Sequence, residues 1–230
     1  MHKLSGMFRP ADLFDLGHTA HAALFDGCTH AWEALPRIES YLQERLQPAC
    51  RGRVVGRAVI GERVFIGEGT VIEDGVVIQG PAIIGCNCEI RHNAYLRANV
   101  IIGDRCVIGN ATEVKNAVLF DEAVAPHFNY VGDSILGFRA HLGAGAILSN
   151  FKSLPGNVTV EFDGVRYDTG LRKFGALVGD GAEIGCNAVL NPGSVIGRGS
   201  VVYPGVCWRG VLPPNRIVKN RAAFEIVERR

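Results

Sequence analysis

An aliphatic residue recurs at every sixth position through the first half of the chain. Between Arg53 and Lys115 the pattern never fails, and glycine often follows the aliphatic residue directly. This interval fits neither the helical period of 3.6 residues nor the alternation of a simple strand. The recurring positions are Val54, Ile60, Ile66, Ile72, Ile78, Ile84, Ile90, Leu96, Ile102, Ile108 and Val114.

A strict interval of six predicts a left-handed parallel β-helix made of hexapeptide repeats. In this fold three hexads form one triangular coil, and the aliphatic residues point into the prism. Glycine, Asn and Asp are expected near the corners because they tolerate positive φ. Each coil buries its faces only against its neighbours, so several coils are needed for stability. The predicted class is therefore mainly β.

The pattern stops between Asn116 and Ile135 and then resumes in a shifted register, at Leu136, Leu142, Leu148, Val178, Ile184, Leu190, Ile196 and Val202. The gap between Leu148 and Val178 is thirty residues, a whole number of hexads, so an insertion at about 152–172 returns the chain to the same register. Residues 158–162 and 165–167 alternate around Asp163-Gly164. This predicts a β-hairpin with a type I′ turn that projects as a flap.

The two ends of the chain lack the six-residue pattern. We expect residues 1–52 to form a small helical segment, packed on the first coils or on a neighbouring subunit. One helix is expected to begin at Pro10 and run through Leu16, and Pro36 is expected to separate two further helices. The sequence Leu212-Pro213-Pro214-Asn215 is predicted to end the β-helix, which then spans 53–212 and leaves a tail at 213–230.

Composition narrows the class of protein. The net charge of +1 does not indicate a nucleic-acid or anionic-membrane binder. No apolar run reaches the roughly 20 residues of a membrane span, and we expect no secretory signal. The seven cysteines include no CxxC pair, which indicates reduced thiols and a cytoplasmic protein. The hexad cysteines are expected to be small buried residues: Cys86, Cys88, Cys106 and Cys186.

Two basic residues directly follow inward-pointing positions and therefore face outward. Arg97 and Lys115 are eighteen residues apart, which is one full coil, so they stack on the same face. Such a pair is either a phosphate clamp or two solvated charges.

Two sets of histidines are candidates for a functional role. His127 follows Pro126 inside the stretch where the pattern stops, and interruptions of a solenoid are where function gathers. A lone histidine is otherwise more often structural. His18, His21 and His30 have no carboxylate or cysteine at ligand spacing, so we expect capping or surface roles and no metal site.

Three linked motifs carry a family resemblance: Asn110-Ala-Thr-Glu113-Val-Lys115, then His127-Phe-Asn-Tyr130-Val-Gly132-Asp133, then Leu142-Gly143-Ala144-Gly145 with Asn150-Phe151. Over roughly 53–221 the chain resembles the C-terminal acetyltransferase domain of the bacterial bifunctional N-acetylglucosamine-1-phosphate uridyltransferase/glucosamine-1-phosphate acetyltransferase. The hexads are shared by many acyltransferases, whereas the Glu-x-Lys and His-x-x-Tyr-x-Gly-Asp elements are more specific.

The resemblance implies an N-acetyltransferase of UDP-N-acetylglucosamine biosynthesis. It would use acetyl-CoA as co-substrate and an amino-sugar phosphate such as glucosamine-1-phosphate as acceptor, in a homotrimer with pockets between adjacent prisms. By position, His127 matches the general base. The matched substrate-binding residues are Arg97, Lys115, Tyr130, Asn150 and Lys173, the last reaching a neighbouring subunit's site. His141 stands where the family has a substrate-binding Asn. The positions that contact acetyl-CoA are Ala144, Cys186, Pro204 and Arg221, with different residue types at Cys186 and Pro204.

Other features depart from the family and leave alternatives open. Phe151 replaces a Tyr, and the long hairpin replaces a short Asn-Tyr-Asp-Gly loop. No Leu-x-x-Gly-x-Gly signature is present, so we expect no uridyltransferase domain. The main alternative is a non-catalytic prism that binds a sugar nucleotide or partners a separate sugar-phosphate nucleotidyltransferase. A metal hydrolyase of the prism-shaped carbonic anhydrase type would need a pair of histidines five residues apart, which is missing.

Overall fold

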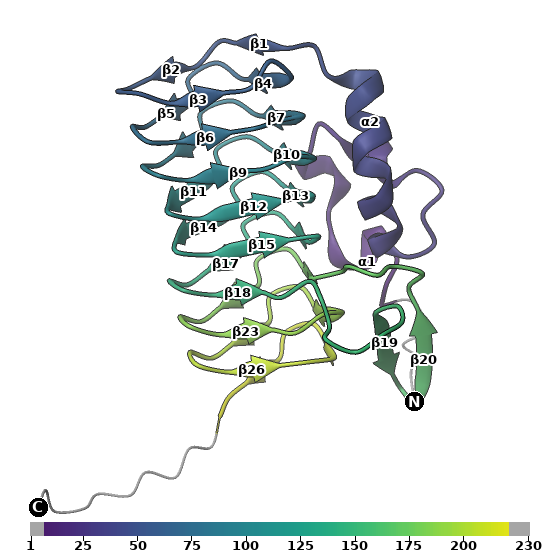
Figure 1. The fold of residues 1–230 in the computed structure, drawn as a ribbon. Helices are drawn as coiled ribbons and strands as arrows, with labels where there is room; N and C mark the ends of the chain where they lie inside the picture. Colours follow the sequence, from purple (N-terminus) through teal and green to yellow (C-terminus); the bar gives the residue numbers. More distant parts are fainter. Residues whose placement is uncertain (1–6, 221–230) are drawn as a thin grey trace, which may run out of the picture.

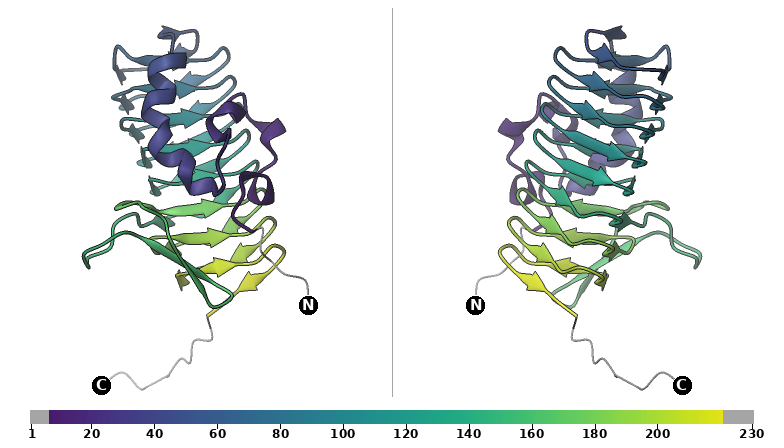
Figure 2. Two further views of the ribbon diagram at one scale, coloured as in Figure 1. Left: turned by 90° about the vertical axis from the view of Figure 1, so that its right-hand side faces the viewer. Right: turned by 90° about the vertical axis from the view of Figure 1, so that its left-hand side faces the viewer.

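A triangular prism of short parallel strands forms the body of the protein, and a helical segment lies along one of its walls (Figures 1 and 2). This computed structural model describes residues 7–220. Each strand of the prism pairs in parallel with the equivalent strands of the neighbouring coils, and the end strands pair on one side only, which makes three sheets. The predicted fold class, a mainly β left-handed parallel β-helix, is confirmed.

The three sheets, named A, B and C, follow one another around each coil. Sheet A contains β1 (Ala49–Cys50), β4 (Val64–Ile66), β7 (Ala82–Ile84), β10 (Val100–Ile102), β13 (Ala117–Leu119), β16 (Ile135–Leu136), β21 (Ala176–Val178), β24 (Ser194–Ile196) and β27 (Val211–Leu212). Sheet B contains β2 (Arg53–Val54), β5 (Val71–Ile72), β8 (Glu89–Ile90), β11 (Val107–Asn110), β14 (Val124–His127), β17 (His141–Leu142), β22 (Glu183–Ile184), β25 (Val201–Val202) and β28 (Ile217–Val218). Sheet C contains β3 (Val59–Ile60), β6 (Val77–Ile78), β9 (Tyr95–Leu96), β12 (Glu113–Lys115), β15 (Tyr130–Gly132), β18 (Ile147–Leu148), β23 (Val189–Leu190) and β26 (Cys207–Trp208).

The aliphatic positions of the pattern form the core of the prism. From Ile66 to Leu190 they are at most 1% exposed and stack on the same position of the next coil. Full burial of each such side chain contributes about 1.5–3 kcal/mol. Val54 remains 41% exposed, because it lies in the end coil, where sheet B has a neighbouring strand on one side only.

The prism is continuous where the six-residue pattern stops. We expected an irregular stretch at 116–135, but β13, β14 and β15 pair with the coils on both sides. The inward residues are Leu119, Ala125 and Val131. The steps from Val114 to Leu119 and from Val131 to Leu136 contain five residues instead of six. Both short steps turn the corner between sheets C and A, the same corner at which the 152–172 insertion leaves the prism.

The limits of the prism also differ from the prediction. β1 pairs with β4, so the first coil begins at Ala49 instead of residue 53. The proline pair after Leu212 does not end the fold, because β28 pairs with β25 through Val201 and Ile217. Pro213 and Pro214 instead lie in the turn between β27 and β28, where they leave strand pairing intact.

The N-terminal segment consists of short helices joined by turns. The α-helices are α1 (Pro10–Leu13) and α2 (Ile38–Arg45), and the 3₁₀ helices are η1 (Leu16–His18), η2 (Ala22–Phe25) and η3 (Ala31–Arg37). The helix expected from Pro10 through Leu16 is wrong: Phe14 is extended and ends α1 after one turn. Pro36 lies in η3, directly before α2, and therefore separates two helices as expected.

This segment covers the outer face of sheet A and does not stop at the first coils. Phe14, Phe25, Trp32 and other apolar side chains pack on the outward residues of six sheet A strands, namely Ile83, Ile101, Val118, Ile135, Leu177 and Val195. Figure 2 shows α2 and the preceding helices lying across this wall. Sheet A is therefore buried on both faces, which explains why β4, β7, β10, β13 and β21 are apolar at three successive residues.

The insertion forms the predicted hairpin of β19 (Thr159–Phe162) and β20 (Val165–Asp168). Asp163 and Gly164 both have positive φ, as a type I′ turn requires. The hairpin is not a free flap. Val158 and Val160 are 1% exposed, and Phe162 and Tyr167 contact Phe8 of the N-terminal segment edge-on. The hairpin thus extends the wall built by the helices (Figure 1).

Cysteine burial agrees with the sequence at two of four hexad positions. Cys88 and Cys106 are buried, Cys86 is half-buried and Cys186 is exposed, and all are free thiols.

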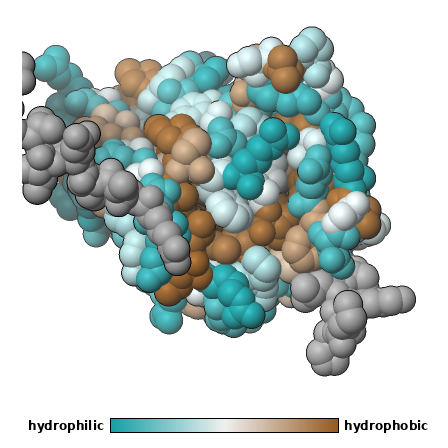
Figure 3. Space-filling view, turned by 90° about the horizontal axis from the view of Figure 1, so that it is seen from below, coloured by the Kyte–Doolittle hydropathy of each residue, from teal (hydrophilic) through white to brown (hydrophobic). Residues whose placement is uncertain are grey.

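Within residues 7–220, no helix is long and apolar enough to cross a membrane. The end of the prism that carries the last coil shows hydrophobic surface among hydrophilic residues (Figure 3). In the last coil, Ile217 is 55% exposed.

We expect the helical cover to be sensitive to acid through His21. Its ring nitrogen Nδ1 lies 3.1 Å from Tyr41 Oη, and burial lowers the pKa of His21 below the usual 6.5, against the raising effect of Asp104. Between pH 6.5 and the lower folded-state pKa, the unfolded chain binds a proton that the folded chain does not. Stability should therefore fall as the pH drops below about 6.5. His21→Gln should reduce this loss in thermal melts at pH 5 to 8, and His92→Gln, at an exposed position, should not.

Candidate functional site

One column of side chains runs down the prism where the sheet C strands end. The register aligns Arg97 with Lys115, Lys115 with Gly132, and Gly132 with the residue that follows β18. In full, the column is Arg97, Lys115, Gly132, Ser149, Asn191 and Arg209. Successive members are about 4.8 Å apart, the spacing of neighbouring strands. The predicted stacking of Arg97 and Lys115 is thereby confirmed.

A pocket of about 240 Å³ opens around the upper half of this column and is lined by Arg97, Lys115, Tyr130, Asn150, Phe151 and Lys173. Five of these are residues that the sequence assigned to substrate binding. Lys173 lines the pocket because the two ends of the insertion lie side by side, where Phe151 and Lys173 form an antiparallel β-bridge. The resemblance implied that Lys173 serves a neighbouring subunit, but here it lines the pocket of its own chain.

Asp133 organises the floor of the pocket. It is 5% exposed and accepts hydrogen bonds from Lys115 Nζ at 3.2 Å and Asn116 Nδ2 at 2.9 Å. Asn150 Nδ2 donates to the same carboxylate. Gly132 leaves this floor open, since a Cβ there would lie 2.7 Å from both Asn150 Nδ2 and Tyr130 Oη. One buried carboxylate therefore holds Lys115 and Asn150 in place.

The second cation of the pocket also has a carboxylate partner. Arg97 Nη1 donates to Glu113 Oε1 at 3.0 Å, and this contact raises the pKa of Arg97. Burial raises the pKa of Tyr130, and the charge of Glu113 adds to that effect. The group thus combines three cations (Arg97, Lys115 and Lys173) with two carboxylates (Glu113 and Asp133). It retains a net positive charge that suits an anionic group such as a phosphate.

His127 does not line this pocket. It ends β14 at the corner between sheets B and C, and its side chain is exposed beside Phe128. In the described part of the chain the ring of His127 has no hydrogen-bond partner, whereas its backbone N–H donates to Asn129 Oδ1 at 3.0 Å. The irregular loop that drew attention to His127 in the sequence is in fact a regular coil.

The sequence-predicted acetyl-CoA residues share the column of His127. The register places His127, Ala144, Cys186 and Pro204 at the same position of four successive coils. Their carbonyls are joined to the next coil, as in Gly145 N–H to His127 O at 2.9 Å and Asn187 N–H to Ala144 O at 2.8 Å. From His127 to Pro204 this edge is about 14 Å long. Cys186 and Pro204 are exposed along it.

The remaining sequence predictions for the site concern His141, Arg221 and the metal site. His141 lies in β17 on the outer face of sheet B, away from the pocket residues. Arg221 lies outside the described residues. Between residues 7 and 220 there is no group of three His, Cys, Asp or Glu side chains placed to hold a metal ion.

Asp133 and Glu113 are the site residues that the sequence left without a role. Both belong to the motifs that carry the resemblance, next to Gly132 and two residues before Lys115. Asp133 has φ of 45° at the shortened corner between sheets C and A, and Asn116 has φ of 46° at the equivalent corner one coil earlier. The five-residue steps were the available sequence signal, because Asn116 and Asp133 both lie at such a shortened corner.

Replacing Asp133 with Asn should destabilise the fold and loosen the pocket. Asn tolerates the positive φ, but its NH₂ group would face donors from Lys115, Asn116 and Asn150. At least one buried donor then loses its acceptor, which costs about 1–3 kcal/mol in unfolding free energy. Urea denaturation measures this cost.

Asp163→Asn is the matched control. Asp163 also has positive φ, of 51°, but lies in the hairpin turn, where Asn-Gly suits a type I′ turn equally well. Its unfolding free energy should change by less than about 0.5 kcal/mol. Equal effects of the two changes would show that Asp133 does not organise the pocket.

The comparisons with known proteins match part of the chain. Residues 78–166 match the family described as the GMPPB C-terminal domain. A bifunctional sugar-1-phosphate nucleotidylyltransferase/acetyltransferase of Sulfurisphaera tokodaii is 36% identical over 89 residues, which is 39% of this chain and 22% of the relative. The bifunctional protein GlmU of Methanococcus vannielii is 33% identical over 69 residues, 30% of this chain and 16% of the relative. The chain thus spans less than a quarter of the length of these relatives, and the resemblance drawn from the motifs is confirmed over this part.

Among solved structures, a putative acetyltransferase of Bacillus cereus has a TM-score of 0.31 and 20% identity. The match covers 73% of this chain and 77% of that one.

Proposed function

We propose that this protein transfers an acetyl group from acetyl-CoA to the amine of an amino-sugar phosphate. The observation that carries the proposal is the arrangement on sheet C. A cationic pocket lies at the end of its strands, and the column of His127, Ala144, Cys186 and Pro204 follows its other edge. The segment from His127 to Asp133 joins the two, with Tyr130 between them.

The chemistry assigns a role to each group. Arg97, Lys115 and Lys173 bind the phosphate, which positions the amine. His127 takes the proton as the amine attacks the thioester carbonyl; the C–N bond forms, the C–S bond breaks, and CoA leaves as the thiolate, which is then protonated. The N–H of Ala144 has no acceptor among the described residues and is available to the oxyanion of the tetrahedral intermediate. The partly matched relative of Sulfurisphaera tokodaii, named as a nucleotidylyltransferase/acetyltransferase, supports this class of reaction.

A homotrimer is part of this proposal. Sheet A is covered by the helices, whereas the pocket and the His127 edge both open on sheet C. A neighbouring prism beside sheet C would close the site from solvent and complete it. Analytical ultracentrifugation tests this, and a monomer that turns over substrate would contradict it.

A binding module is the second candidate. It is favoured by the position of His127, whose ring is exposed and has no hydrogen-bond partner among residues 7–220 to orient it. In this case the cationic pocket would hold a sugar nucleotide without chemistry, beside a separate nucleotidyltransferase.

Release of free thiol from acetyl-CoA separates the two candidates. The acceptor panel is glucosamine-1-phosphate, other amino-sugar phosphates and nucleotide-linked amino sugars. Release that depends on one acceptor supports the acetyltransferase. No release with any acceptor, and no rise in melting temperature with acetyl-CoA, would favour the binding module.

A further inference from the structure

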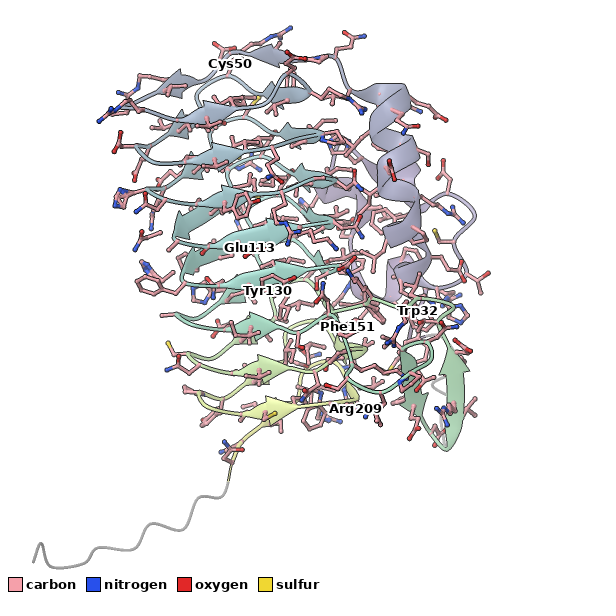
Figure 4. All side chains as sticks on the ribbon, viewed as in Figure 1. Trp32, Cys50, Glu113, Tyr130, Phe151 and Arg209 are labelled. Atoms are coloured by element: carbon pink, nitrogen blue, oxygen red, sulfur yellow. The ribbon has the colours of Figure 1, made fainter. Side chains whose placement is uncertain are left out.

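A second pocket lies below the first on the same column, between the insertion and the last coils. It has a volume of about 500 Å³, and its lining includes Ser149, Asn191 and Arg209 of the column together with Lys152, Thr159 and Arg166 of the insertion. Phe151 lines both pockets. Figure 4 shows Tyr130, Phe151 and Arg209 at successive levels on this side of the prism. The two pockets are therefore adjacent and share the Phe151 side chain.

Three cations line this second pocket, and no carboxylate does. In the described chain, Lys152 and Arg209 form no ion pair. The contact of Arg166 with Glu161 is long, at 4.0 Å, and both side chains are more than 65% exposed. Such an exposed pair contributes little. A second hairpin carboxylate is also close, because hydrogen bonds from Gly170 and Asn157 and the charges of Arg166 and Lys152 lower the pKa of Asp168. The pocket lining itself nevertheless carries only positive charge, which favours an anion with several phosphate oxygens.

An aromatic side chain marks the upper end of the pocket. Arg172 lies over the Phe151 ring, 4.7 Å from its centroid, and is held by the carbonyls of Leu154 and Gly156 at 3.1 and 2.7 Å. Phe151 is nevertheless 50% exposed. It therefore offers surface on which a planar ring can stack. The hydroxyls of Ser149 and Thr159 and the amide of Asn191 supply neutral polar groups of the kind that bind a sugar.

The distance between the cations of the first pocket and those of the second pocket exceeds the size of one phosphate group. Along the column, Lys115 and Asn191 are three coils apart, about 14 Å, and Arg209 is one coil further. A ligand that reaches both pockets must extend over this length. A sugar monophosphate satisfies the upper pocket alone.

We propose that the second pocket binds a nucleoside diphosphate, the carrier part of a nucleotide-linked amino sugar. Its phosphates contact Lys152, Arg166 and Arg209, and its base stacks on Phe151. This rests on the proposed function only in making the attached sugar the acceptor. The acetyl-CoA edge runs along the opposite side of sheet C, so the CoA nucleotide is a different ligand of a different surface.

Calorimetric titration of the full chain with UDP, GDP, ADP, pyrophosphate and CoA tests the proposal. At least one nucleoside diphosphate should bind, and pyrophosphate should bind more weakly. Arg209→Gln and Lys152→Gln should each weaken nucleoside diphosphate binding about tenfold or more. Phe151→Leu should weaken the nucleoside diphosphate and leave pyrophosphate unchanged. The control Arg53→Gln removes an exposed cation from the far end of the prism and should change nothing.

Three results would overturn the proposal. These are no binding of any nucleoside diphosphate, equal affinity for pyrophosphate, and displacement of the bound nucleotide by CoA in the wild type with the same sensitivity to Arg209→Gln. Melting temperatures of all variants, compared with the wild type, establish that each one is folded.

Kinetics separate this proposal from the proposed function. If acetyl transfer occurs, Arg209→Gln should raise KM for a nucleotide-linked amino sugar about tenfold and leave KM for the corresponding sugar-1-phosphate unchanged. An unchanged ratio would contradict the second pocket while the acetyltransferase stands. Nucleotide binding without transfer to any acceptor would contradict the acetyltransferase while the second pocket stands.

Discussion

His127→Ala should lower the rate of acetyl transfer by about 10²- to 10⁴-fold, the contribution of a positioned general base. The attacking amine must lose a proton as the C–N bond forms, and imidazole is the side chain best suited to accept that proton near neutral pH. His127 is exposed at the end of β14 and donates no side-chain hydrogen bond to another described residue. Its removal should therefore leave the melting temperature unchanged. Steady-state thiol release gives kcat and KM together.

His141→Ala is the matched control for this change. His141 is also an exposed histidine on a sheet B strand, one coil further along, but its side chain faces away from sheet C. It should keep kcat within a factor of about three. The expected pattern for His127→Ala is a fall in kcat with little change in KM, since the phosphate contacts remain. A fully active His127→Ala variant would remove His127 from the mechanism.

The fold could be predicted from the sequence because every coil must meet the same packing requirement. The inward position must be aliphatic in every hexad, and its neighbours in the stack are always one coil away. Between Asn116 and Ile135 the pattern failed because two corners are one residue shorter. A five-residue step shifts the count without disturbing the strand pairs, so a count by sixes reads it as irregular structure. The three-dimensional register of β13, β14 and β15 shows no gap.

The helical cover was the less predictable part. The sequence indicated helices within residues 1–52, but not which wall of the prism they bury. That information lay elsewhere, in the outward residues Ile101 and Val118 and their equivalents, which make sheet A apolar on both faces. Sheets B and C carry polar or charged residues at many outward positions, such as Glu89, Glu113 and His141, and are left open.

Some site residues could be predicted from the repeat and others could not. Arg97 and Lys115 follow from the register alone, because a fixed period places them in one column. Asp133 and Lys173 reach the pocket through a shortened corner and through the closure of an insertion, which no period describes. Lys173 was available only from the resemblance to a known family.

Gly109→Ala should destabilise the prism by at least about 3 kcal/mol, because added volume cannot be accommodated there. Gly109 lies in β11, which pairs with β14, and a Cβ at this position would lie 1.4 Å from Pro126 O and 2.0 Å from Pro126 C. Its φ is not positive, so the strain comes from contact with the next coil and not from backbone conformation. The sequence attributed the hexad glycines to corners; at this position glycine is required instead by the close approach of two strands. Because the displaced backbone leads directly into His127, catalysis should fall together with stability, as urea denaturation and thiol release would show.

Gly205→Asn, in the same prism, should by contrast leave the stability almost unchanged. Gly205 has φ of 69° and open space at its Cβ position, and Asn187 and Asn93 occupy the equivalent corner of other coils with φ of 55° and 58°. Since Asn already fits this corner twice, the unfolding free energy should change by no more than about 0.5 kcal/mol. A mild effect of Gly109→Ala, close to that of Gly205→Asn, would mean that β11 and β14 can separate locally. In that case the position of His127 would not be fixed by the strand pairing that we infer holds it.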